Sequence, residues 1–215
     1  MAEPRHHDAT TAAARFAAGT RVRGTDTQPP VPAAPARTLN AVRVDVVGLV
    51  REVAEQLQQL PSTTSPMDAL AQVHNGFGAL TLAAAVLDGQ GSSTARTNEY
   101  AAISLAVVAA HEHIADVVDE QLLDDTIDAR VLDLLDDAEN LHRIRVSARW
   151  LRAAAIETAE ATRAALAHLA DRPELPAEFA EAVDLTGRTA ADIRILLDGP
   201  ADKRAALTAA ILQRM

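Results

Sequence analysis

The motif Glu139-x-x-His142 has the spacing that best suits a metal ion in this chain. One helical turn separates the two side chains, as in helical bundles that bind two iron ions. His111 and Glu112 precede an acidic turn near residue 125 by about as much as Glu139 follows it, so a hairpin there would bring them level. The four residues form a candidate metal site, but a two-iron site needs a second motif and two further carboxylates. The alternative is a surface ion pair between Glu139 and Arg143.

A second pattern, over residues 179–194, resembles a DNA-binding helix-turn-helix. The second helix would carry Arg188 and Arg194 toward the bases. Two positions depart from the motif, because Asp184 stands where glycine is usual and Ala190 where a larger apolar residue is usual. The alternative is ordinary helix packing in a small C-terminal subdomain.

Three arginines, Arg145, Arg149 and Arg152, share one face of an expected helix, with Trp150 beside them. Such a patch is suited to nucleic acid or to an acidic protein surface. The alternative is that they pair with acidic residues of the preceding segment, namely Asp116, Asp119, Glu120, Asp124 and Asp125.

The sequence contains no arrangement that predicts catalysis. We find no nucleophile with a base and an acid, no glycine-rich phosphate loop after a strand, and no HExxH zinc motif. The chain has no cysteine, which excludes disulfides and thiolate metal ligands and fits a reducing cytoplasm. We therefore expect no catalytic residue, no enzymatic activity and no cofactor.

The composition predicts an all-α protein with a core of small and branched aliphatic side chains. Hydrophobic residues make up 48% of the 215 residues, but aromatic residues only 2%. A net charge of −10 disfavours non-specific binding to nucleic acid or anionic membranes. The longest apolar runs, residues 79–87 and 101–110, are too short to span a bilayer, so we expect a cytoplasmic protein.

The expected centre of the fold is a long antiparallel hairpin over residues 97–170, folded back at residues 123–126. Apolar residues recur every three or four positions from Leu134 to Leu169, and no Gly or Pro interrupts residues 126–172. This pattern predicts one helix of roughly 60 Å. Shorter neighbours would leave its seam uncovered between Ala155 and Leu169, so we expect self-association, most simply as a homodimer.

Shorter helices complete the expected architecture. A helix over residues 38–60 precedes one that Ser65 caps, with Pro66 at its first position and Asp68 at its third. Gly76 and Gly78 would let a neighbouring helix approach closely. Residues 38–172 then form a helical bundle. A disordered, proline-rich tail covers residues 1–37, and residues 173–215 form a helical cap with helices over 176–183, 189–197 and 201–213.

The segment from Ala12 to Thr25, the Pro29-Pro30-Val31-Pro32 run and the helix from Leu39 resemble the opening of small accessory proteins of actinobacterial phages and prophages. The resemblance covers residues 12–45. It implies DNA binding through a later helix-turn-helix or a zinc ribbon, and the lack of cysteine excludes the ribbon. We therefore expect a non-enzymatic interaction or assembly protein that binds a protein partner or itself. The alternatives are a DNA-binding regulator and a metal-binding bundle.

Overall fold

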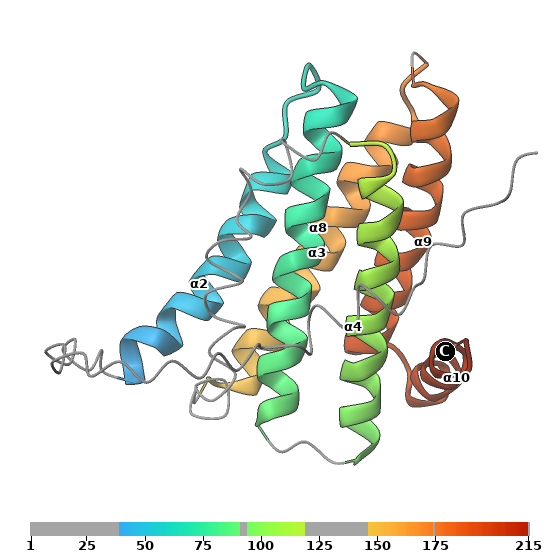
Figure 1. The fold of residues 1–215 in the computed structure, drawn as a ribbon. Helices are drawn as coiled ribbons and strands as arrows, with labels where there is room; N and C mark the ends of the chain where they lie inside the picture. The colour runs from blue at the N-terminus through green and yellow to red at the C-terminus, as the bar shows by residue number, and fades with distance from the viewer. Residues whose placement is uncertain (1–38, 91–93, 119–145, 174, 215) are drawn as a thin grey trace, which may run out of the picture. The chain divides into compact units, whose positions relative to one another are not determined.

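The computed structural model describes residues 39–90, 94–118, 146–173 and 175–214. Within these ranges the regular structure is helical and no strand is found, which confirms the all-α fold. The described helices, shown in Figure 1, are α2 (Leu39–Gln58), α3 (Pro66–Gly89), α4 (Thr94–Ala115), α8 (Ala148–Ala170), α9 (Ala177–Asp198) and α10 (Ala201–Leu212). The tail predicted over residues 1–37 and the turn predicted at 123–126 lie outside the described residues.

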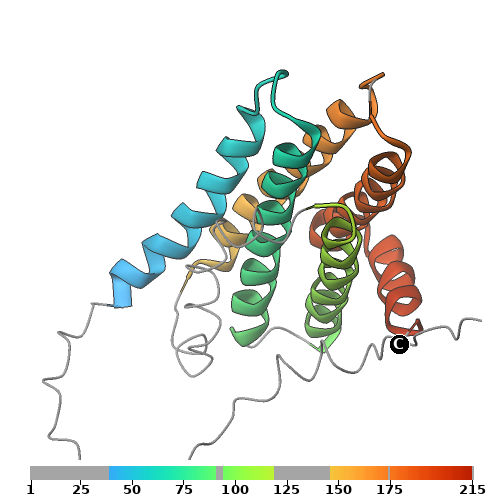
Figure 2. The same cartoon turned by 45° about the horizontal axis from the view of Figure 1, so that its top comes forward.

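The helices pack in two layers, which Figures 1 and 2 show from two directions. α2, α3 and α4 follow one another side by side, and α8 and α9 lie behind them. α3 contacts α2, α4 and α8, while α9 contacts α8, α4 and α10. α9 is thus part of the bundle rather than of a separate C-terminal cap. α10 packs mainly on α4 and α9.

The start of α3 follows the predicted capping pattern. Ser65 is the N-cap, and its hydroxyl accepts a hydrogen bond from the Asp68 backbone N–H at 3.1 Å. Pro66 occupies the first turn, where its missing N–H costs nothing. The predicted start of this helix is therefore confirmed.

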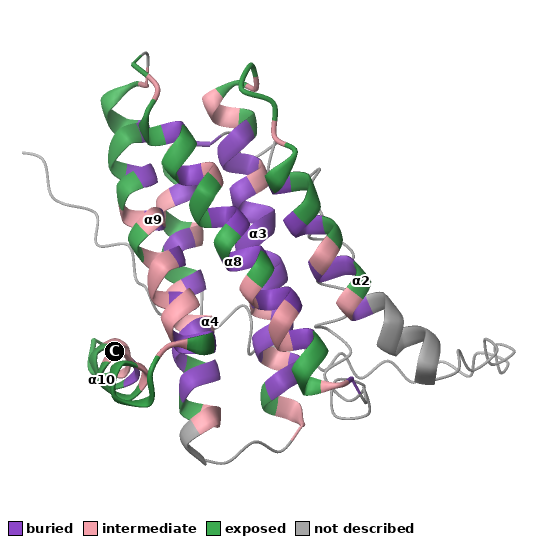
Figure 3. Cartoon of the chain, turned by 180° about the vertical axis from the view of Figure 1, so that it is seen from behind, coloured by how far each residue is buried: buried purple, intermediate pink, exposed green. Residues whose placement is uncertain are grey.

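α3 is the central helix of the bundle, and Figure 3 shows the buried residues concentrated there. Of the described helices, it is the one long and apolar enough to cross a membrane. However, 83% of its most apolar window is buried inside the protein. A helix that is apolar on all sides is expected where other helices surround it, so packing within the bundle accounts for its composition.

α8 fits tightly between α2 and α3 through two buried threonines. The Thr158 hydroxyl donates to the carbonyl of Val50 in α2 at 2.9 Å. Thr162 lies against Gly76 in α3, where a Cβ atom would stand 2.5 Å from the Thr162 hydroxyl oxygen. The prediction that Gly76 permits a close helix approach is confirmed.

The predicted long helix over residues 126–172 is wrong at its start. Val146 and Ser147 are not helical, and Ser147 has the extended φ and ψ of an N-cap residue. α8 begins at Ala148 and has 23 residues, about 35 Å by the helical rise. Serine is a preferred N-cap residue, although the Ser147 side chain makes no capping hydrogen bond here.

The partner of α8 also differs from the prediction. α8 packs mainly on α2, α3 and α9, and α4 packs mainly on α3, α9 and α10, so α4 and α8 do not form a hairpin. The antiparallel partner of α8 is α9, which the short loop at residues 171–176 connects to it. The apolar seam of α8 is covered within one chain, since Leu166 and Leu169 are each 1% exposed. The argument for a homodimer through that seam therefore fails.

Candidate functional site

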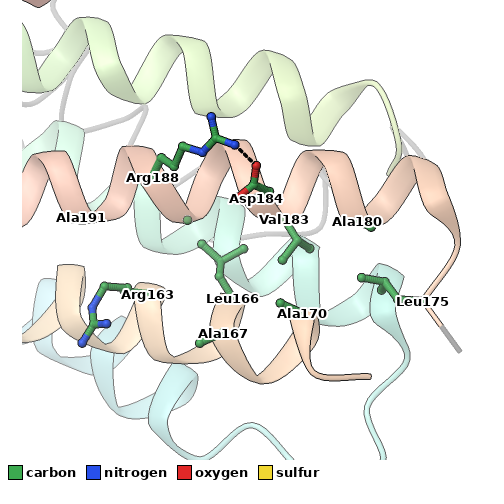
Figure 4. Close-up of a pocket in the computed structure, with 11 residues that line it drawn as sticks. Arg163, Leu166, Ala167, Ala170, Leu175, Ala180, Val183, Asp184, Arg188 and Ala191 are labelled. Carbon is green, nitrogen blue, oxygen red and sulfur yellow. Dashed lines mark hydrogen bonds and ion pairs between the residues drawn. The ribbon is translucent and has the colours of Figure 1, made fainter. Parts of the chain in front are cut away.

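An open groove runs along the α8–α9 pair, and Figure 4 shows it with its lining side chains. Its volume is about 590 Å³. We call it the α8–α9 groove, and its lining residues are Arg163, Leu166, Ala167, Ala170, Leu175, Ala180, Val183, Asp184, Gly187, Arg188 and Ala191. Most of these are apolar or small, so the groove offers a surface that gains free energy when apolar side chains cover it.

Small residues on both helices explain why the groove is open. Leu166 and Val183 are buried at its floor, at 1% and 2% exposure. Farther out, α8 contributes alanines and α9 contributes Ala180 and Gly187. A Cβ atom built on Gly187 meets no atom of the chain within 4 Å. Larger side chains at these positions would fill the space that separates the outer faces of the two helices.

The charged residues of the groove lie at its rims. Arg163 on α8 is exposed, and no ion pair involves it within the described residues. On α9, Arg188 pairs with Asp184 one turn earlier, and their side chains are 70% and 59% exposed. These three side chains sum to one positive charge in a chain whose net charge is −10.

Just beyond the groove, an ion pair joins the two helices. Arg194 on α9 donates from Nε to the Glu160 carboxylate of α8 at 2.8 Å, and its Nη1 lies 3.6 Å from Asp198. Arg194 therefore helps to fix α9 on α8 and is only 30% exposed.

The predicted helix-turn-helix is wrong. Residues 177–198 form one continuous helix, α9, with no turn at 184–188. Thr186 is fully buried and donates to the Ala182 carbonyl within the helix. Glycine disfavours a helix interior by only about 1 kcal/mol, so Gly187 does not break a helix that is packed along α8. Arg188 and Arg194 consequently lie on the same helix but bind carboxylates of the chain.

The predicted arginine patch is only partly present in the described residues. Arg145 lies outside them. Arg152 is half-buried, and its Nη2 donates to the Tyr100 hydroxyl of α4 at 3.0 Å. Arg149 is exposed, while Trp150, 56% exposed, lies under the Arg51 guanidinium at 5.6 Å. The described arginines thus diverge, and Arg152 pairs with a phenol rather than with the acidic residues proposed as its alternative partners.

Of the four residues of the predicted metal site, the structure describes His111 and Glu112. Glu139 and His142 lie outside the described residues. The His111 ring stacks on His74 of α3 with ring centroids 4.1 Å apart, and Glu112 is exposed. No group of three metal-ligating side chains occurs within the described residues.

His111 is held in its neutral form. Burial, and after it the charge of nearby His74, together lower its pKa from 6.5 to about 3. The edge of Phe77 completes the surroundings, with ring centroids 6.4 Å apart. His74 was not a candidate from the sequence, because it lies far from His111 along the chain and only the packing of α3 on α4 brings the two rings together.

A second polar cluster fastens α10 to the bundle. The Glu99 carboxylate of α4 accepts from Arg204 Nε of α10 at 2.9 Å and from Arg96 Nη1 at 2.6 Å, with its side chain 8% exposed. Arg204 also donates to the Gly199 carbonyl at the start of α10. Every charged group here has a partner, so the cluster has a structural role.

Comparison with protein families, with curated proteins and with solved structures finds no match to this chain. Within the described residues, the α8–α9 groove offers an open, largely apolar surface to a ligand.

Proposed function

We propose that this chain is a non-enzymatic helical interaction protein that binds a partner protein through the α8–α9 groove. The observation that supports this is an apolar, open groove between two helices that are otherwise well packed. Apolar surface that water must cover is a common mark of a binding site. Covering it with the side chains of a partner would contribute roughly 25 cal/mol for each Å² of apolar surface removed from water.

The distribution of polar groups favours a protein partner over a small molecule. Small-molecule sites generally enclose most of their ligand and direct a few polar groups at it. In the α8–α9 groove the polar side chains lie at the rims and the floor is apolar, formed by Leu166 and Val183. An apolar centre with a polar rim is the usual organisation of a protein interface.

The N-terminal resemblance, over residues 12–45, supports an origin among accessory proteins of actinobacterial phages, and the lack of cysteine supports a cytoplasmic location. We do not propose DNA binding through residues 179–194, because α9 has no turn there.

A pair of glycine substitutions tests the proposal. Gly187→Leu would place a side chain in the groove, whereas Gly48→Leu would place the same side chain on an exposed position of α2. Neither position has an atom within 4 Å of the new Cβ, so both variants are expected to fold. In affinity purification from the native host, a groove partner should be recovered with the wild type and with Gly48→Leu and be lost with Gly187→Leu. Equal recovery with all three proteins would contradict the proposal.

A further inference from the structure

We infer, building on the proposed function, that the occupant of the α8–α9 groove is an amphipathic helix of the partner protein, with small apolar residues on one face and acidic residues flanking it. The shape of the groove argues for the helix. The charges at its two rims argue for the acidic residues.

The small residues along the groove suit a third helix. Helices pack with their axes 8–10 Å apart, and small side chains permit the lower end of that range. Ala167 and Ala170 on α8 and Ala180 and Gly187 on α9 border the groove on its two sides. A partner helix lying along it would insert residues spaced three or four apart, as in helix-in-groove recognition. An added strand would need a sheet edge, and the described residues contain no strand.

Arg163 supplies the first argument for acidic flanks. It is exposed at the α8 rim, and no ion pair involves it within the described part of the chain. Arginine binds carboxylates in a two-pronged geometry that lysine lacks. An acidic residue on the near side of the partner helix would pair with it.

Arg188 supplies the second argument, at the α9 rim. Its present partner is Asp184 on the same helix, and both side chains are largely exposed. Pairs of this kind contribute only about 0.3–0.5 kcal/mol, so Arg188 can exchange Asp184 for a partner carboxylate at little cost. The net charge of −10 does not prevent this, because screening limits charge effects to about 8 Å at physiological salt.

Two synthetic helical peptides test the inference. Both carry the same alanine and leucine face, and the positions beside that face are glutamate in one and lysine in the other. Their binding to the purified full chain is measured by fluorescence polarisation. We expect the glutamate peptide to bind the wild type more tightly than the lysine peptide, by roughly three- to tenfold for one or two exposed charge pairs. The Gly187→Leu variant should bind neither peptide.

Charge reversal provides the matched control. Arg163→Glu should weaken binding of the glutamate peptide and strengthen binding of the lysine peptide. Arg149→Glu makes the same charge change at an exposed position near the start of α8, away from the groove lining, and should leave both affinities unchanged.

The other outcomes separate the inference from the proposed function. Equal binding of the two peptides, still blocked by Gly187→Leu, would overturn the acidic partner and leave the groove as the binding site. Binding that Gly187→Leu does not affect would overturn both. If neither peptide binds the wild type at millimolar concentration, the inference of a helical occupant is overturned. The affinity purification with Gly187→Leu and Gly48→Leu then decides whether the groove binds a partner. A wild type that dimerises in light scattering while Gly187→Leu stays monomeric would replace the partner helix with a second copy of this chain.

Discussion

Gly76 in α3 and Thr162 in α8 lie in direct contact, so that a Cβ atom on Gly76 would be 2.5 Å from the Thr162 hydroxyl oxygen. The same Cβ would be 3.0 Å from a methyl group of Leu57 in α2. The three helices of the core therefore meet at a position where no side chain fits.

Gly76→Ala should destabilise the protein for this reason. Overpacking in a tight core typically costs 1–3 kcal/mol, which outweighs the gain of about 1 kcal/mol in helix propensity. Urea denaturation followed by circular dichroism measures the change. The double variant Gly76→Ala with Thr162→Ala relieves the contact and should recover part of the loss. An increase in stability for the single variant would show that the helices are not so closely packed.

Gly187→Ala should have the opposite effect. The new methyl group meets nothing within 4 Å, so the variant gains helix propensity without a clash. We expect the free energy of unfolding to rise by about 0.5–1 kcal/mol. Gly48→Ala, at a similarly open helical position, is the matched control and should give a similar rise. A loss of stability at Gly187 alone would mean that this position is filled or that α9 is bent there.

The Glu99–Arg204 pair should control the docking of α10. Arg204→Met removes the hydrogen bond to Glu99, while Arg96 still pairs with the carboxylate. A hydrogen bond to a charged group contributes about 1.5–3 kcal/mol. Hydrogen exchange should accelerate in α10 before it accelerates in α3. Lys203→Met, at the exposed neighbouring position, should not change exchange, and an equal effect of the two variants would contradict the role of the pair.

The low pKa of His111 makes the fold sensitive to acid. Above pH 6.5 the residue is neutral in both the folded and the unfolded chain, so it adds no pH dependence. Between pH 6.5 and about 3 only the unfolded chain takes up the proton, because burial keeps the pKa of folded His111 near 3. The free energy of unfolding should then fall by about 1.4 kcal/mol for each unit by which the pH is lowered. Denaturation at pH 7.5, 6 and 5 measures the slope.

His111→Gln provides the comparison for that slope. It removes the titrating group, so stability should depend on pH less steeply than in the wild type, whatever the variant does to stability at neutral pH. Equal slopes of unfolding free energy against pH in the two proteins would show that His111 does not cause the acid sensitivity.

Local signals in the sequence predicted much of the fold. The cap formed by Ser65 and Asp68 and the close approach at Gly76 were both recognisable, because each depends on residues whose physical role is narrow. The pairing of the helices could not be recognised from the sequence in this way. The α8 stripe shows that one face is buried but does not say which helix covers it, and α8 packs on α9 rather than on α4.

The sites were harder to predict than the helices. The resemblance of residues 179–194 to a helix-turn-helix predicted a turn, yet α9 is continuous there, so the DNA-reading roles of Arg188 and Arg194 lost their basis. The groove was missed because alanine in a helix is ordinary, and only the antiparallel pairing of α8 with α9 gathers Ala167 and Ala180 in one place. The His74–His111 stack was missed because it depends on contacts between separate helices.

Site-specific photo-crosslinking tests the central claim most directly. A photoreactive phenylalanine derivative replaces Arg163 or Asp184, exposed residues at the two rims of the α8–α9 groove, in the chain expressed in its native host. The control replaces Ala109, an exposed alanine on α4 beside Val108, which is itself 47% exposed. We predict that irradiation links a partner protein at the two groove positions, through a helical segment, and not at Ala109. A partner linked at Ala109 but at neither groove position would contradict the account.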